Sequence, residues 1–423
     1  MLLQMRGRLS VMMFLEYFIW GAWYVTLGTW LGQQLHFSGQ QIALAAGTTA
    51  LGAMLSPFLV GLMADELFAN QRLLAALHGI GGVLLWFAST QSSFAAIYVV
   101  LLVYSLCYMP TMALTNALAF RQMKDPKEDF GSIRVLGTAG WIVAGLFLNA
   151  LGKLPSYQGI EATAVPIRVA AICSIAMAFY SLTLPHTPPL RSAHGFKISN
   201  IFPPEAFALF KDRNFTVFVL ASFLICIPLQ FYYTFTNPFL NEIGVQNVVG
   251  KMTMGQMSEL LFMVTLPWFF RRLGVKYTLM LGMLAWVLRY ICFGVGNSSN
   301  LVWLLYAGIV MHGICYDFFF VTGQVYVDQK APQALRAAAQ GLITFITYGI
   351  GMFIGSWICG RVVDLYASTS ATGNILHNWR SIWMVPAIAS AIVLLFFWVG
   401  FRSGEGQTSS NAVVPDASGS AKA

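Results

Sequence analysis

The chain has 423 residues, of which 57% are hydrophobic and only 9% are charged. A soluble domain carries roughly 25% charged residues, so the composition excludes an ordinary soluble fold and favours a chain that spans a lipid bilayer. The net charge of +8 comes from basic residues scattered in short loops, without a basic helix or a basic and aromatic module, which argues against a nucleic-acid-binding protein. The six cysteines form no C-x-x-C pair, and we expect no disulfide framework, metal site or cofactor.

Twelve windows of the sequence are long and apolar enough to cross the membrane as helices, which takes roughly 20 residues each. In chain order they lie at about 9–31, 41–64, 73–90, 95–120, 133–152, 166–185, 214–240, 253–270, 277–296, 301–327, 337–365 and 380–401. The longest loop is polar and rich in proline, and it divides the windows six and six. We therefore expect an N-terminal six-helix bundle at 1–186, a cytoplasmic connector at 187–213, a C-terminal six-helix bundle at 214–402 and a disordered tail at 403–423.

The distribution of basic residues predicts the orientation of the chain. With the N-terminus in the cytoplasm, 17 of the 24 basic residues fall in cytoplasmic segments and 4 in outer segments, which is the asymmetry that the positive-inside rule requires. Both chain ends should therefore be cytoplasmic, and the number of spans even. Two six-helix halves joined by a cytoplasmic connector indicate an all-α membrane protein with the major facilitator fold, which we expect in the cell (inner) membrane.

Ionisable side chains inside the spans are candidate functional residues, because an uncompensated charge at the bilayer centre costs at least about 2.5–3.5 kcal/mol. Glu16, in the first span, can either line a cavity or pair with a neighbouring helix. Arg134 opens the fifth span, where a basic residue is common at a cytoplasmic helix end. The alternative is that Arg134 reaches inward to an acidic partner, with Thr138 four residues later on the same face.

The seventh and eighth spans carry polar residues at helical spacing. Gln230 and Tyr233 belong to a polar stripe in the seventh span, which is typical of a cavity wall but also of hydrogen bonding between helices. Gln256 and Glu259 are three residues apart in the eighth span and share a face. The carboxyl group of Glu259 can accept hydrogen bonds from sugar hydroxyls, carry a proton, or pair with a neighbouring helix.

The ninth and tenth spans hold the remaining candidates. His312 and Tyr316 are four residues apart in the tenth span, and Asp317 follows directly. This group offers rings for stacking, a titratable site, and both donors and acceptors, although Asp317 could instead pair with a structural arginine. Arg289, deep in the ninth span, is better interpreted as a structural cation that snorkels or pairs.

The chemistry of these candidates suits a nucleoside or a sugar. Aromatic faces can stack on a base or a sugar ring, and a ligand rich in hydroxyl groups needs amides and carboxylates. A phosphate ester fits poorly, because the spans contain no cluster of arginine or lysine residues.

Six short stretches, in order along the chain, carry a family resemblance. They are residues 18–23, 108–111, 133–138, 256–259, 316–319 and 336–341. Here the chain resembles the nucleoside:proton symporter family of the major facilitator superfamily, and is most similar to its less characterised branch of proposed nucleoside transporters. The resemblance implies nucleoside uptake driven by the inward proton gradient. It also implies that the family's cavity residues fall on Arg134, Thr138, Gln230, Gln256, Glu259 and Asp317, with aromatic positions at Trp141 and Tyr316.

Three positions depart from the pattern of the family's best-known members. Tyr233, His312 and Glu16 stand where the resemblance leads us to expect asparagine, tyrosine and glutamine. We expect Tyr233 and His312 to contact the substrate, and Glu16 to be a further candidate for proton coupling.

The predicted mechanism is alternating access between two halves that rock about a central substrate site. Glu259 would hold the ribose hydroxyls, and Tyr316 or Trp141 would stack on the base. Asp317 and Arg134 would form a proton-sensitive pair, with Glu259 as a rival proton site, because protonation of a carboxyl group breaks its ion pair and shifts the balance between states. The expected partners are a nucleoside, protons and the lipid bilayer, and the protein is expected to be a monomer without catalytic residues.

Two alternatives stay open. A proton-coupled transporter of sugars or another small polar solute would use the same fold. A membrane-embedded enzyme is remote, because the six histidines form no cluster with metal-ligand spacing, and no Ser/His/Asp or H-E-x-x-H arrangement is visible.

Overall fold

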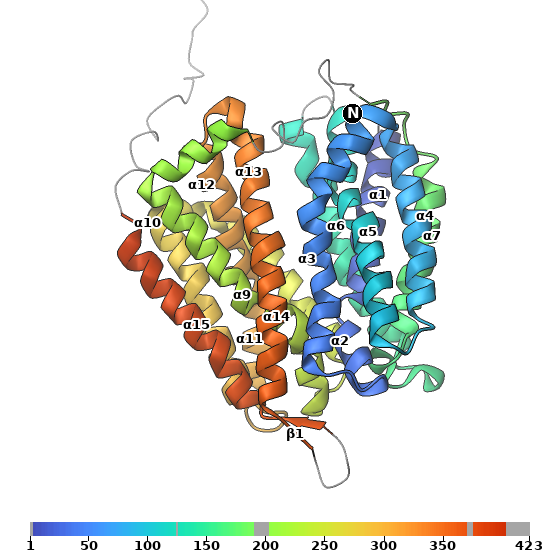
Figure 1. Ribbon diagram of the computed structural model, residues 1–423, viewed down its shortest axis with the longest axis vertical. Helices are drawn as coiled ribbons and strands as arrows, with labels where there is room; N and C mark the ends of the chain where they lie inside the picture. The colour runs from blue at the N-terminus through green and yellow to red at the C-terminus, as the bar shows by residue number, and fades with distance from the viewer. Residues whose placement is uncertain (1–2, 124–125, 190–202, 370–374, 403–423) are drawn as a thin grey trace, which may run out of the picture.

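The computed structural model describes residues 3–123, 126–189, 203–369 and 375–402, which are almost entirely helical (Figure 1). The strands in these ranges are β1 (Ala367–Thr369) and β2 (Ile375–His377), which pair antiparallel in a short hairpin. The predicted disordered tail at 403–423 and the middle of the predicted connector at 187–213 lie outside the described residues.

The described part of the first half consists of seven α-helices with short π-helical and 3₁₀ segments between them, and two of these helices begin with a serine cap. They are α1 (Leu3–Trp23), α2 (Leu27–Thr29), α3 (Gly39–Leu62), α4 (Asn70–Ala88), α5 (Phe94–Gln122), α6 (Pro126–Leu151) and α7 (Val165–Ser181), with π-helical η1 (Trp30–Gln34) and η2 (Met63–Leu67) and 3₁₀ turns η3 (Pro155–Tyr157) and η4 (Ile160–Ala162) between them. Ser38 and Gln41 form a reciprocal capping box at the start of α3. Ser93 accepts a hydrogen bond from the Ala96 N–H at the start of α5, so both helices begin after a serine.

The second half contains the longer helices. They are the 3₁₀ segment η5 (Pro204–Lys211), α9 (Arg213–Glu242), α10 (Val248–Val295), α11 (Val302–Cys315), η6 (Tyr316–Val321), α12 (Thr322–Lys330), η7 (Gln333–Leu335), α13 (Arg336–Thr344), η8 (Phe345–Gly351), α14 (Met352–Leu365) and α15 (Trp379–Gly400). Asp212 caps α9 by accepting a hydrogen bond from the Phe215 N–H at 2.7 Å. The segments η6 and η8 are π-helical turns inside otherwise α-helical rods.

Twelve spans account for these helices. Ten described helices are long and apolar enough to cross a membrane, and a bent pair, 155–162 with 165–181, gives an eleventh span. The 48 residues of α10 are more than twice the length that one crossing needs, and the helix breaks at Gly274, where φ is 70°. A positive φ favours glycine, so α10 divides there into two spans. The predicted all-α fold with twelve transmembrane helices is confirmed.

The helices gather in two groups, which we call the N-terminal bundle (α1 to α7) and the C-terminal bundle (α9 to α15) (Figure 1). In the first, α1 packs on α6 and α7, and α4 packs on α5 and α7. In the second, α10 packs on α11 and α15. The bundles meet where α3 packs on α14 and η8, and where α6 packs on α10.

Each bundle begins and ends at the same end of the molecule. The Tyr180 hydroxyl at the end of α7 donates to the Arg8 carbonyl at the start of α1. Asn214, at the start of α9, exchanges two hydrogen bonds with the backbone of Arg402, just after α15. We call this the terminal end and the opposite one the hairpin end, because β1 and β2 lie there (Figure 1). Such an arrangement requires an even number of crossings in each bundle.

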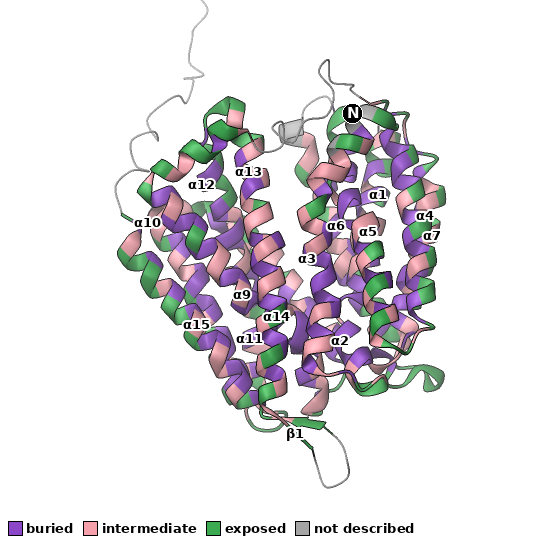
Figure 2. Cartoon of the chain, viewed as in Figure 1, coloured by how far each residue is buried: buried purple, intermediate pink, exposed green. Residues whose placement is uncertain are grey.

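Large apolar side chains cover the outside of the molecule. Val264 is 79% exposed, Leu365 75% and Phe179 69%, and exposed and half-buried residues follow α15 along its length (Figure 2). Inside the bundles, small residues allow close helix contacts: a Cβ atom at Gly140 would meet the backbone of Phe14. An apolar exterior around a core with polar groups is the pattern of a protein dissolved in lipid.

Candidate functional site

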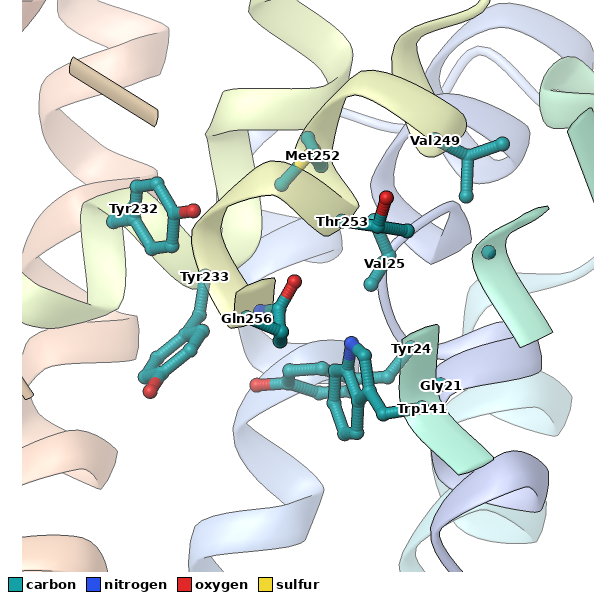
Figure 3. A pocket seen from close by; sticks show the side chains of 11 residues that line it. Gly21, Tyr24, Val25, Trp141, Tyr232, Tyr233, Val249, Met252, Thr253 and Gln256 are labelled. Carbon is teal, nitrogen blue, oxygen red and sulfur yellow. The ribbon is translucent and has the colours of Figure 1, made fainter. Parts of the chain in front are cut away.

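A pocket lies between the two bundles, near the middle of the molecule. It holds about 420 Å³ of space not filled by atoms, and this volume includes open solvent. Aromatic side chains of both bundles line it together with a hydroxyl and an amide of α10: Tyr24, Trp141, Tyr232, Tyr233, Thr253 and Gln256. Figure 3 shows Tyr232 and Tyr233 on one side of this pocket, with Trp141 and Tyr24 on the other. Of the predicted substrate residues, Trp141, Tyr233 and Gln256 therefore line it.

Arg134 and Thr138 continue the wall along α6. Thr138 lies four residues after Arg134 and three before Trp141, so all three share a face of the helix. The guanidinium of Arg134 lies over the ring of Tyr17, with its Cζ atom 4.1 Å from the ring centroid. Arg134 also attracts Glu259 of the other bundle electrostatically. Arg134 and Glu259 thus attract each other across the interface between the bundles, although they form no ion pair.

Glu259 lies one helical turn beyond Gln256 and faces α11. Its Oε2 atom is 3.9 Å from Nε2 of His312, and the Glu259 side chain is 14% exposed. The ring of His312 stacks on Tyr232 with 5.3 Å between centroids and meets Tyr233 edge-on at 6.2 Å. Glu259 therefore lies between aromatic residues of the C-terminal bundle and the positive charge of Arg134.

Asp317 is fully buried in the π-helical turn η6, and neither of its carboxyl oxygens has a hydrogen-bond partner among the described residues. Its carboxyl group is electrostatically coupled to Glu259. The predicted contact between Asp317 and Arg134 is not formed in this structure. A buried carboxylate without a donor is costly, and binding a proton removes that cost. Such π-helical turns are uncommon and are often found at functional sites.

Tyr316 opens the same turn and extends the aromatic wall. Its ring lies 6.0 Å from His312 and 5.6 Å from Phe320, measured between centroids. Gln230 of α9 is buried, and its amide donates to Thr234 on the same helix at 3.0 Å. Gln230 does not line the pocket itself but lies one turn from the tyrosine pair that does.

Glu16 lies apart from this group, within the N-terminal bundle. It is fully buried; its carboxyl oxygens contact Nε2 of His78 at 2.9 Å and accept a hydrogen bond from Thr111 at 2.6 Å. His78 in turn contacts Ser174 at 3.2 Å. The sequence left two interpretations open for Glu16. In the structure it pairs with neighbouring helices and does not line the central pocket.

Eight of the eleven residues that line the pocket were not selected from the sequence, and two of them, Tyr24 and Tyr232, are aromatic. Tyr232 belongs to the polar stripe of the seventh span, from which Gln230 and Tyr233 were selected. Tyr24 lies in the turn between α1 and α2. Nothing in the sequence distinguishes Tyr24 from the other aromatic residues of the first span, because its place on the pocket depends on how the helix ends.

A set of hydrogen bonds joins the two bundles at the hairpin end, and we call it the Glu161 latch. The carboxylate of Glu161, in η4, accepts from the side-chain amides of Asn237 at 2.7 Å and Asn241 at 3.1 Å and from the Val249 N–H at 3.0 Å. Thr29 donates to Asn237 at 2.5 Å. These hydrogen bonds thus join η4 and α2 of the N-terminal bundle to α9 and α10 of the C-terminal bundle.

A second carboxylate adds to the closure at this end. Asp364 of α14 accepts hydrogen bonds from the Gly39 and Gln40 N–H groups at the start of α3, at 2.6 and 2.9 Å. Among the described residues, no comparable hydrogen bond joins the bundles at the terminal end. Figure 1 shows α3 and the rod of α13 and α14 diverging towards that end. The central pocket is therefore closed towards the hairpin end.

A sequence model of the family described as "Nucleoside H+ symporter" matches residues 2–406. The chain belongs to the nucleoside H+ symporter family. It is 41% identical over 404 residues to "Putative nucleoside transporter YegT" of Escherichia coli (strain K12), with 95% of each chain covered. To "Nucleoside permease NupG" of the same organism it is 30% identical over 415 residues, covering 95% of this chain and 96% of the other. To the "Xanthosine permease" of that strain it is 31% identical over 410 residues, covering 93% and 95%.

Solved structures agree with this membership. The crystal structure of nucleoside transporter NupG superimposes with a TM-score of 0.84 at 29% identity, covering 95% of this chain and 100% of the other. A POT family transporter in complex with 5-aminolevulinic acid, at 13% identity, has a TM-score of 0.68 and shares the fold alone. The symporter family has the predicted major facilitator fold. The relatives named above are transporters and permeases, so the alternative of a membrane-embedded enzyme is set aside.

Proposed function

We propose that this symporter imports nucleosides together with protons, by alternating exposure of one central site. The observation that carries the proposal is the pocket between the bundles. Its Trp141 lies two helical turns after Arg134 on α6, and its Gln256 lies one turn before Glu259 on α10. The pocket thus has an aromatic face beside an amide, and the carboxylate of Glu259 follows that amide on the same helix. A nucleoside offers a flat base for the aromatic face and ribose hydroxyls for the amide and the carboxylate.

Each cavity residue has a proposed role. Trp141 stacks on the base, and Tyr316 extends the aromatic wall towards Glu259. Glu259 accepts hydrogen bonds from the ribose hydroxyls, and Gln256 binds polar atoms of the base. Thr138, Tyr233 and His312 line the remaining surface, while Gln230 supports Tyr233 from the same helix.

Protons act at the buried carboxyl groups near the substrate. Asp317 has no hydrogen-bond donor among the described residues, and it is coupled to Glu259, which is attracted to Arg134 of the other bundle. Protonation of Asp317 removes one of two neighbouring negative charges, so the balance of charge across the interface changes. This links proton binding to the relative stability of the two orientations.

The arrangement in the membrane follows from the basic residues. The terminal end faces the cytoplasm, with both chain ends and the connector at 187–213, and the protein resides in the inner membrane. The bundles at 1–186 and 214–402 move as units, and the closed hairpin end makes the present state inward-facing. One chain supplies both walls of the site, so the monomer is the functional unit.

Competition binding separates nucleosides from sugars. Purified protein in detergent is incubated with radiolabelled uridine or adenosine, and unlabelled nucleosides, maltose, sucrose and D-ribose are added as competitors. We expect nucleosides to displace the label, D-ribose to compete at least tenfold less well because it lacks the base, and the disaccharides not to compete. Displacement by the disaccharides, or the absence of nucleoside binding, would contradict the proposal and favour another polar solute.

A further inference from the structure

Arg289 is a buried cation in the C-terminal bundle that pairs with none of the described carboxylates. Its side chain is fully buried in the second part of α10, and no described acidic residue forms an ion pair with it. The Nε atom donates to the Gly308 carbonyl of α11 at 2.9 Å, while Nη1 and Nη2 have no hydrogen-bond partner among the described residues. The sequence led us to expect that Arg289 snorkels or pairs with an acid, but it is fully buried and forms no ion pair with a described residue.

The charge of Arg289 is directed at Tyr232. The guanidinium carbon lies 3.3 Å from the centroid of the Tyr232 ring, the contact of a cation with the negative face of an aromatic ring. Placed there, the cation draws electron density from the phenol and makes its O–H group a stronger hydrogen-bond donor. A guanidinium has no acceptor atom, so Arg289 cannot use the hydroxyl proton itself.

No described group accepts a hydrogen bond from the Tyr232 hydroxyl, since its polar neighbour Arg289 can only donate, and the Tyr232 residue is only 2% exposed. Tyr232 lines the central pocket, and Figure 3 shows its hydroxyl directed towards the other lining side chains, whereas that of Tyr233 is directed away from them. A buried donor without an acceptor is unfavourable unless a ligand supplies one.

We propose that Arg289 is a specificity-determining positioning residue, which strengthens the Tyr232 hydroxyl as a donor to a carbonyl oxygen or ring nitrogen of the nucleobase. The inference rests on the proposed function and adds to it a way of selecting the base. Arg289 does not touch the substrate. It acts through Tyr232, and it fixes α10 against α11 through the Gly308 carbonyl.

Two probes separate this role from a structural one. Uridine carries acceptors on its base, whereas ribosylbenzene has the ribose and a flat ring without any acceptor. We expect Tyr232→Phe to weaken uridine binding about tenfold, the effect of one lost hydrogen bond, and to leave ribosylbenzene binding within about twofold. Arg289→Met should likewise reduce the preference for uridine over ribosylbenzene, and Arg289→Lys should retain part of that preference. The double variant should be no worse for uridine than Tyr232→Phe.

The assay uses the full-length protein in detergent, with the unfolding temperature of each variant measured in parallel. If Arg289→Met does not fold, Tyr232→Phe and Arg289→Lys still decide the question. Tyr232→Phe keeps the aromatic ring, and Arg289→Lys keeps the positive charge. An unchanged preference for uridine in Tyr232→Phe, or equal losses for both probes in the Arg289 variants, would overturn the inference alone. Wild-type protein that binds no nucleoside would overturn the proposed function as well.

Discussion

Glu259→Gln and Asp317→Asn are each expected to lower proton-driven nucleoside uptake at least tenfold. Both substitutions preserve size and remove the group that binds a proton. Glu259→Gln should also weaken nucleoside binding, because a hydrogen bond to a charged group contributes about 1.5–3 kcal/mol. Asp317→Asn should leave binding nearly intact, since the Asp317 carboxyl group has no partner among the described residues to lose.

Proteoliposomes give the required comparison. Uptake of radiolabelled uridine is measured with the outside acidic, and exchange of nucleoside at equal pH is measured in the same vesicles. Asp317→Asn should retain exchange and lose the response to the pH gradient. Asp328→Asn is a matched control, because Asp328 lies at the surface of α12, 3.5 Å from Arg336. Full proton-driven uptake in both Glu259→Gln and Asp317→Asn would show that neither residue couples transport to protons.

Glu161→Ala is expected to shift the protein towards the state that is open at the hairpin end. The substitution removes three hydrogen bonds to one carboxylate, those from Asn237, Asn241 and Val249. A loss of 1.4 kcal/mol changes the ratio of two states tenfold, and each such bond contributes about 1.5–3 kcal/mol. The state that is closed at the hairpin end should therefore lose its dominance even if solvent replaces two of the three bonds.

Spin labels across the interface report this shift. Cysteines introduced at the exposed positions Leu154 and Leu376, in a chain whose native cysteines are replaced, place one label on each bundle at the hairpin end. The distance between the labels should lengthen in Glu161→Ala. Glu205→Ala serves as the control, because Glu205 is an exposed acid in η5. An unchanged distance distribution would mean that the Glu161 latch does not hold this end closed.

The spans could be predicted from the sequence because they depend on hydropathy and length. The windows at 253–270 and 277–296 correspond to the two parts of α10, and the break at Gly274 falls between them. The turns η6 and η8 could not be predicted, since a π-helical turn adds a residue without a change in composition. Their positions depend on packing between helices, which single-sequence patterns do not specify.

The candidate site was predictable in its membership but not in its contacts. The cost of a charge in lipid pointed to Glu259, Asp317 and Arg134. The partners of these residues depend on how each helix is rotated about its axis: Asp317 lies in a π-helical turn beside Glu259 rather than against Arg134. The partner of Glu16 could not be predicted either, because His78 is distant in sequence and lies on another helix, α4.

The most direct test of the central claim is an experimental structure of the protein with a bound nucleoside. The account predicts the base against Trp141 and Gln256, and the ribose hydroxyls within hydrogen-bonding distance of Glu259. Asp317 and Arg134 should lie beside the same chamber, on opposite bundles. A nucleoside bound elsewhere, with the side chains of Glu259, Asp317 and Arg134 remote from it, would contradict the account while leaving the fold intact.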